Sequence, residues 1–150
     1  MPAGPSISSG LITVPLVDCI SERIAIHRRG TCSWTGLPNR PAFMRDLGRI
    51  LARSRRAGDF RYAVLFVDVD RFKLVNDSLG HEAGDRLIRE VGLRLKAHMR
   101  EDDTVARLGG DEFVVALFNV ESDDVVLHAM QRILAEMTRP FAIGDRELFV

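Results

Sequence analysis

The sequence has little of three features that would point to particular classes of protein. Its two cysteines, Cys19 and Cys32, match neither a metal-binding nor a redox spacing, so we expect ordinary reduced thiols in a cytoplasmic protein. Lysine plus arginine and aspartate plus glutamate number 21 each, which argues against nucleic acid or an anionic membrane as a partner. No apolar run is long enough to span a bilayer. These shortages predict a soluble chain with a small-molecule partner.

Residues 1–30 differ in composition from the rest of the chain. Pro2, Pro5 and Gly10 stand among serines without helical or strand periodicity, which predicts a linker or disordered arm. Residues 21–29 also suit the end of a helix that arrives from an upstream domain. With 150 residues, 46% of them hydrophobic, the chain is long enough for one domain with a core, which we assign to residues 31–150.

Helical patterns recur after this arm. Asn39 can cap a first helix that Gly58 ends, a short helical turn closes at Gly80 before a long helix, and Ser122 can cap another. The apolar stripes of the three longer helices are Phe43, Leu47, Ile50 and Leu51, then Leu87, Ile88, Val91 and Leu95, then Val126, Met130, Ile133, Leu134 and Met137.

A Gly-Gly pair between two apolar runs marks the most informative stretch. Gly109 and Gly110 can take positive φ at both central positions of a tight hairpin, so residues 104–108 and 112–118 are predicted to pair as antiparallel strands. The turn then delivers two adjacent carboxylates, Asp111 and Glu112, at its tip. A solvated turn without any chemistry explains the same four residues.

A second acidic group follows the apolar run at residues 62–67. Because the run is apolar on both faces, it predicts a central strand covered on both faces, with Asp68 and Asp70 at its end, where open α/β sheets hold ligands. Carboxylates that converge there repel one another unless a divalent cation lies among them. Their hard oxygens suit Mg²⁺ or Mn²⁺ rather than Zn²⁺.

Four segments, residues 35–40, 68–73, 76–85 and 109–113, carry a joint pattern. In this order they closely resemble the GGDEF domains, the diguanylate cyclases that join two GTP molecules into cyclic di-GMP. Four blocks in the right order make the resemblance specific, and it extends from Thr35 to Val150. It implies an α+β fold in which flanking helices cover the palm-like sheet of nucleotidyl cyclases.

The resemblance also implies a reaction. The 3′-hydroxyl of one GTP attacks the α-phosphorus of another and releases pyrophosphate. Asp68 and the Val69 carbonyl would bind Mg²⁺ or Mn²⁺, Asp111 would bind metal and activate the hydroxyl, and Glu112 would complete the acidic pair. Because each subunit presents one GTP, a homodimer is implied.

Six residues are implied as substrate contacts. A carboxylate at Asp85 accepts from guanine N1–H and the exocyclic amine together, with Asn76 as the second base contact. Taken alone, Asn76 also suits a turn, Asp85 the first turn of a helix, and Lys73 a solvent-facing position. The six are Phe72, Lys73, Asn76 and Asp85, together with Gly109 and Gly110, whose backbone N–H groups would approach phosphate.

A product site is implied by Arg100 and Asp103. They reproduce the family's RxxD element, which binds cyclic di-GMP through an arginine fork on phosphate and a carboxylate on the base edge. Arg132 on the following helix would add a further arginine. A charged helix end explains residues 100–103 without a ligand.

The chain departs from the family pattern in two places. The usual acid and leucine are missing near Cys32 and Trp34, and residues 147–150 form a predicted strand after which family members continue with a further strand and a helix. We therefore expect an incomplete GGDEF domain, one that resembles those preceding an EAL phosphodiesterase domain, and the activity of these residues stays open. Two other interpretations remain: a catalytically silent module that binds GTP or cyclic di-GMP, and a metal-binding or purely structural α+β domain.

Overall fold

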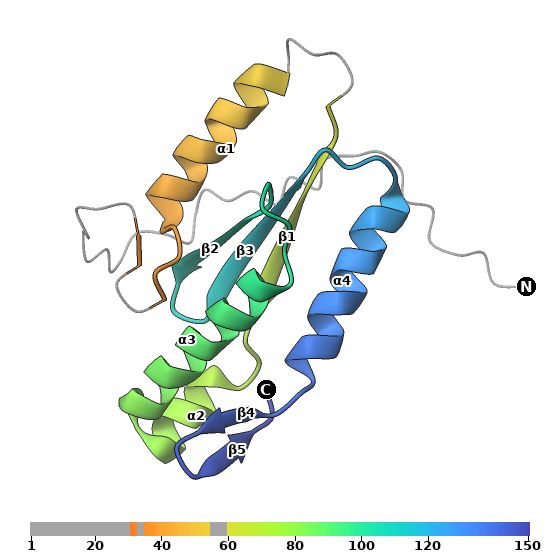
Figure 1. Cartoon of the computed structure of the whole chain (residues 1–150). Coiled ribbons are helices and arrows are strands. Elements are labelled where there is room, and N and C mark those ends of the chain that lie inside the picture. Colours follow the sequence, from red (N-terminus) through yellow and green to blue (C-terminus); the bar gives the residue numbers. More distant parts are fainter. Residues whose placement is uncertain (1–30, 33–34, 55–59) are drawn as a thin grey trace, which may run out of the picture.

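The computed structural model of the chain describes residues 31–32, 35–54 and 60–150 (Figure 1). The expected arm at residues 1–30, the thiol of Cys19 and the expected helix end at Gly58 lie outside the described residues. None of the helices in the described ranges is long and apolar enough to cross a bilayer. The elements in chain order are α1 (Arg40–Ser54), β1 (Tyr62–Asp68), α2 (Phe72–Leu79), α3 (His81–Ala97), β2 (Thr104–Gly109), β3 (Glu112–Phe118), α4 (Asp123–Met137), β4 (Phe141–Ile143) and β5 (Arg146–Leu148).

The main sheet has three antiparallel strands in the order β1-β3-β2. The sequence predicts β1 as the central strand, and this is wrong, because β3 lies between the other two. Every residue of β3 after Glu112 is buried, whereas Phe66 of β1 is 63% exposed. Both runs are equally apolar, so composition does not distinguish a strand with two partners from a strand with one in the described part of the chain.

The residues of β3 alternate between two cores on opposite faces of the sheet. One face packs against α3 and α4, and the other packs against α1. The first set is Phe113, Val115 and Leu117, with Leu87, Ile88, Val91 and Leu95 from α3 and Ala129 and Ile133 from α4. The second set is Val114, Ala116 and Phe118, with Ala106 from β2 and Phe43 from α1. This arrangement confirms the α+β class.

The helix predictions are confirmed in part. Asn39 Oδ1 accepts a hydrogen bond from Ala42 N at 3.1 Å, as expected of a cap. The predicted stripe of α3 is fully buried. Ser122 occupies the position before α4 but makes no side-chain cap. The predicted stripe of α4 is wrong in part, because Leu134 is 61% exposed and faces a groove beside β1 that no described residue fills.

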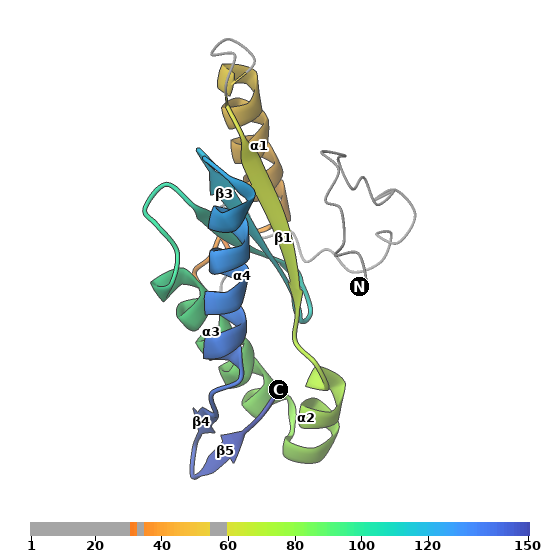
Figure 2. The same ribbon diagram turned by 90° about the vertical axis from the view of Figure 1, so that its right-hand side faces the viewer.

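The β4–β5 hairpin forms a separate two-stranded sheet at the same end of the molecule as α2 (Figures 1 and 2). Its last strand is therefore residues 146–148 rather than the predicted 147–150. Arg94 of α3 holds this region: it donates to the carbonyls of Glu136, Arg139 and Pro140 at 2.8, 2.8 and 3.0 Å. Its guanidinium also lies 3.6 Å from the ring centroid of Phe141.

Candidate active site

The two acidic segments meet at one end of the sheet. Both views show the β2–β3 turn beside the end of β1 (Figures 1 and 2). Asp68 lies opposite Glu112 in the strand register, and Val69 N donates to the carbonyl of Asp111 at 3.3 Å. Asp68 and Glu112 are exposed and Asp111 is half-buried. The structure thus brings together acids that are far apart in the sequence.

The turn itself differs by one residue from the prediction. Strand β2 extends to Gly109, which pairs with Glu112, so the two residues at the tip are Gly110 and Asp111. A register shift between Arg107 and Gly109 places an extra residue, Leu108, in β2 as a bulge. Gly110 has φ 53°, a left-handed conformation that favours glycine. Asp111 therefore stands at the tip rather than at the start of a strand.

Arg107 fixes this tip, and the sequence interpretation missed it. Its Nε and Nη2 donate to the carbonyl of Gly110 at 3.0 and 2.7 Å, and its Nη1 donates to Cys32 Sγ at 3.3 Å. Its backbone N–H donates to the carbonyl of Pro38 at 3.0 Å. The clue in the sequence is a cation three residues before the second glycine. Its planar fork suits two bonds to one oxygen.

The oxygens at this end fit a hard cation. Asp68, the Val69 carbonyl and Asp111 all offer oxygen, and the Val69 carbonyl keeps a lone pair besides the one that accepts Phe72 N–H at 3.3 Å. No group of three or more His, Cys, Asp and Glu side chains in the described ranges is arranged to hold a metal by itself. Mg²⁺ takes few protein carboxylates and keeps waters or substrate phosphates as its other ligands.

The expected base-contacting residues come from two adjoining helices. Asn76 lies within α2, so it is not a turn residue, and its side chain contacts Gly84 of α3, the neighbour of Asp85. The only acid in the first turn of α3 is Glu82, so the interpretation of Asp85 as a first-turn acid is also wrong. Both Asn76 and Asp85 are half-buried.

Two other expected substrate contacts lie on α2. Phe72 packs against the core beneath α3, and its ring approaches Gly84, so it supports the helix pair. Lys73 is exposed on the first turn of α2. The structure therefore places Lys73 in solvent and packs the partly buried Phe72 ring against the core.

The RxxD segment forms a turn after α3 rather than a helix end. Both carboxylate oxygens of Asp103 accept backbone N–H groups, from Arg100 at 3.1 Å and from Phe118 at 3.4 Å. Arg100 and Asp103 both line a cavity of about 550 Å³ at the β2 edge, together with Lys96. Arg132 lies on α4 and does not line this cavity. The structure does not bring Arg132 to the other two.

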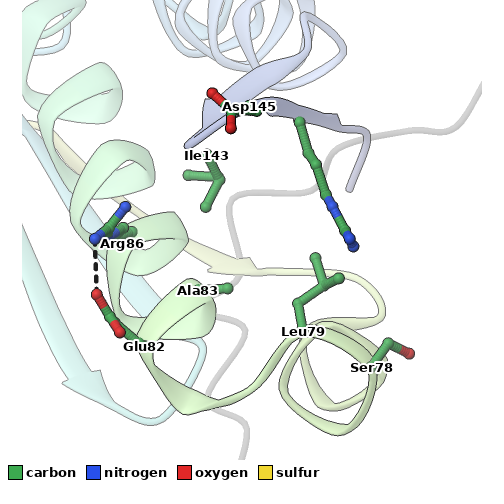
Figure 3. Close-up of a pocket in the computed structure, with 8 residues that line it drawn as sticks. Ser78, Leu79, Glu82, Ala83, Arg86, Ile143 and Asp145 are labelled. Atoms are coloured by element: carbon green, nitrogen blue, oxygen red, sulfur yellow. Dashed lines mark hydrogen bonds and ion pairs between the residues drawn. The ribbon is translucent and has the colours of Figure 1, made fainter.

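A separate hollow lies between the α2–α3 junction and the β4–β5 hairpin (Figure 3). It has a volume of about 470 Å³, and its lining includes Arg86, which is paired with Glu82 at 2.7 Å. The sequence interpretation did not predict it. In the described ranges no buried side-chain nitrogen or oxygen lacks a hydrogen-bond partner.

Comparison with known proteins agrees with this geometry. The sequence profile of the family described as "Diguanylate cyclase, GGDEF domain" matches residues 32–150. The chain belongs to the GGDEF family. The match includes the acidic turn, the end of β1 and the adjoining helices α2 and α3, and it confirms the family that the four sequence segments predict.

Three known proteins are similar to the chain. It is 44% identical over 121 residues to the diguanylate cyclase TpbB of Pseudomonas aeruginosa, which covers 79% of this chain and 27% of TpbB. A structure of the GGDEF domain of TpbB has a TM-score of 0.75 at 41% identity, covering 79% of this chain and 69% of that one. The cyclic di-GMP phosphodiesterase NbdA of Pseudomonas aeruginosa is 41% identical over 116 residues, covering 77% of this chain and 15% of NbdA.

The third is a GGDEF domain with a nucleotide. The GGDEF domain of DgcB from Caulobacter crescentus in complex with c-di-GMP has a TM-score of 0.72 at 28% identity, covering 83% of this chain and 70% of that one. The chain spans about a quarter of the length of TpbB and less of NbdA. The comparisons therefore concern one domain of these longer relatives.

Proposed function

We propose that this GGDEF domain is a diguanylate cyclase that condenses two GTP molecules into cyclic di-GMP and pyrophosphate. The observation that carries the proposal is the backbone bond from Val69 N to the carbonyl of Asp111, which sets the acidic turn beside the end of β1. It unites acids from both segments at a solvent-accessible edge. The similarity to TpbB, named a diguanylate cyclase, supports the same reaction.

The chain's own groups have distinct tasks in this proposal. Asp68, the Val69 carbonyl and Asp111 hold Mg²⁺ or Mn²⁺, and the cation, when bound, offsets triphosphate charge and polarises the α-phosphorus. Asp111 also takes the proton of the attacking 3′-hydroxyl, and Glu112 adds negative charge beside it. Neither Asp68 nor Asp111 has an ion-pair partner among the described residues, so both carboxylates are available.

Substrate binding is assigned to the two helices and to the turn. Asp85 and Asn76 recognise guanine, Lys73 contacts phosphate from α2, and the N–H groups of Gly109 and Gly110 approach phosphate at the tip. A carboxylate recognises the paired donors of guanine, a pattern that adenine lacks, and such a bidentate contact contributes about 1–3 kcal/mol of discrimination. Because one chain offers one such site, we propose that turnover requires a homodimer.

The test is direct: the purified chain is incubated with GTP and Mg²⁺, and nucleotides are separated by chromatography. The expected products are cyclic di-GMP and pyrophosphate, with loss of turnover when Mg²⁺ is chelated. A dilution series adds a second check, since a dimeric enzyme loses specific activity as it dissociates. GTP that stays intact at every chain concentration and with either cation would exclude the cyclase.

A catalytically silent module that binds GTP or cyclic di-GMP is the second candidate. It is favoured by the similarity to NbdA, which is named a phosphodiesterase. Titration together with product analysis separates the two candidates. A silent module binds GTP or cyclic di-GMP and forms no product, whereas a cyclase binds GTP and converts it to cyclic di-GMP.

The proposed product site is Arg100 with Asp103. The cavity that both line, and the c-di-GMP complex of the similar DgcB domain, support it. Because backbone N–H groups already occupy the carboxylate of Asp103, we assign the main contact with product to the exposed guanidinium of Arg100. Arg132 stays a more distant candidate, which a homodimer partner would have to bring to the product.

A further inference from the structure

We propose that Gly84 is a positioning residue for guanine recognition, because the space left by its missing side chain is the space that the Asn76 amide occupies. The inference rests on the proposed function, in which Asn76 contacts the base. It adds a residue that touches no substrate and acts only through its neighbour.

The geometry at Gly84 is tight on the side of α2. A Cβ atom at this position would lie 1.9 Å from Asn76 Oδ1, 2.9 Å from Asn76 Cγ and 3.2 Å from Phe72 Cε2. Real Cβ atoms essentially never lie within 3.0 Å of another heavy atom, so any residue other than glycine must displace the amide. Gly84 is buried, and the approach is therefore enclosed.

Backbone conformation does not explain this glycine. Gly84 lies inside α3 without a positive φ, whereas Gly36, Gly80, Gly110 and Gly144 have one. A glycine inside a helix destabilises it by about 1 kcal/mol relative to alanine. Gly84 therefore lowers the stability of α3, and it does so at the position where the side-chain amide of Asn76 packs against that helix.

An alanine at this position should move the amide and spare the fold. The atoms that it would meet first belong to the end of the Asn76 side chain, which can rotate away, and not to the backbone. Asp85 keeps its own place on α3, so one of two base contacts is lost. A hydrogen bond contributes about 0.5–1.5 kcal/mol, so we expect roughly tenfold weaker GTP binding.

Gly92 provides a matched control on the same helix. It is also buried, and a Cβ there would lie 3.0 Å from Leu37 Cδ1 and 3.5 Å from Phe113 Cε1, so it meets apolar atoms and no base-contacting residue. Any general effect of placing alanine in α3 appears in Gly92→Ala, and an effect through Asn76 does not.

The experiment is a double-mutant cycle on the whole chain. Gly84→Ala, Asn76→Ala, the double variant and Gly92→Ala are titrated calorimetrically with 3′-deoxy-GTP and Mg²⁺, since this probe lacks the attacking hydroxyl and reports binding alone. Gly84→Ala and Asn76→Ala should each lose about tenfold in affinity, and the double variant should lose no more than either. In parallel titrations with 3′-deoxy-ATP, Gly92→Ala should keep the wild-type ratio of 3′-deoxy-GTP to 3′-deoxy-ATP affinity, and Gly84→Ala should lower it.

Two further readouts separate the possible failures. The side-chain amide resonance of Asn76, assigned by its absence in Asn76→Ala, should shift in Gly84→Ala and stay in place in Gly92→Ala. Wild-type affinity in Gly84→Ala, or additive losses in the double variant, would overturn the inference while leaving the proposed function intact. A wild-type chain that binds no guanine nucleotide would overturn both.

Discussion

Strands β1 and β3 have similar sequences and very different surroundings. Among the described residues, β3 has a partner on each side and a packed helix layer on each face, whereas β1 has one partner and exposes Phe66 beside the groove next to α4. In the candidate active site, Asp111 and Glu112 come from the start of the enclosed strand β3 and the turn before it, and Asp68 comes from the end of the exposed strand β1. The comparison teaches that the burial of a strand residue depends on which elements pack around its strand. The acids come together for a different reason, which is that β1 and β3 end on the same side of the sheet.

The largest expected difference concerns stability. Phe113 of β3 is 0% exposed and Phe66 of β1 is 63% exposed, so the same substitution tests both regions. Phe113→Ala should lower the free energy of unfolding by about 3–5 kcal/mol, because it leaves a cavity in the core. Phe66→Ala should change it by less than about 0.5 kcal/mol, as surface changes usually do. Urea denaturation measures both, and equal losses would remove the distinction between the strands.

The second prediction compares the acids from the two regions. Asp68→Asn and Asp111→Asn should each lower turnover on the order of 10²-fold or more, since each removes a charge that helps hold the cation in place. Asp145→Asn, an exposed acid in the β4–β5 turn, is the control and should keep wild-type turnover. Steady-state rates at limiting Mg²⁺ provide the measurement. Wild-type rates in both variants would show that these two acids take no part in turnover.

The sequence predicts the local elements well because hydrophobic period and capping residues are local properties. The stripe of Leu87 to Leu95 and the cap at Asn39 are examples, and the four motif segments identify the family. Three features are not predicted from the sequence: the edge position of β1, the bulge at Leu108, and the two backbone bonds to Asp103. The first depends on pairing between segments that are far apart in the sequence, and the other two depend on strand register and side-chain placement, which the pattern of residue types does not encode. Within the predicted site, the fold brings the segments of Asp68 and Asp111 together. Arg132 instead lies on α4 and does not line the cavity of Arg100 and Asp103.

The third prediction tests what holds the end of α4 and the β4–β5 hairpin against α3. Arg94→Ala should lower the free energy of unfolding by about 1.5–3 kcal/mol, because the charged guanidinium donates to one carbonyl in the last turn of α4 and to two carbonyls after it, and stacks on Phe141. Arg86→Ala is the control, since its exposed pair with Glu82, four residues away on the same helix, contributes only about 0.3–0.5 kcal/mol. Thermal and urea melts of the two variants should differ accordingly. A similar small loss in both would mean that Arg94 is only a surface charge.

The smallest expected effect lies at the β2 edge. Arg100→Ala should weaken cyclic di-GMP binding about tenfold, or ~1.4 kcal/mol, without changing the melting temperature, since its side chain makes no hydrogen bond or ion pair within the described ranges. Asp103→Ala should instead lower the melting temperature, because it leaves two backbone N–H groups without their acceptor. Calorimetry and thermal melts measure these effects. Unchanged product affinity in Arg100→Ala would remove the product site.

The register of the sheet has a consequence for the order of folding. β2 and β3 form a local hairpin, whereas β1 and β3 are separated in the sequence by α2, α3 and β2. Pairing Tyr62 with Phe118 therefore closes a long stretch of chain, and the entropy that this costs is lost before the contacts form. We expect the amides of β2 and β3 to gain protection in pulse-labelled hydrogen exchange before the amides of β1. Asp68 then reaches Asp111 only when β1 pairs with β3, so the two acidic segments of the candidate site come together after the hairpin has formed.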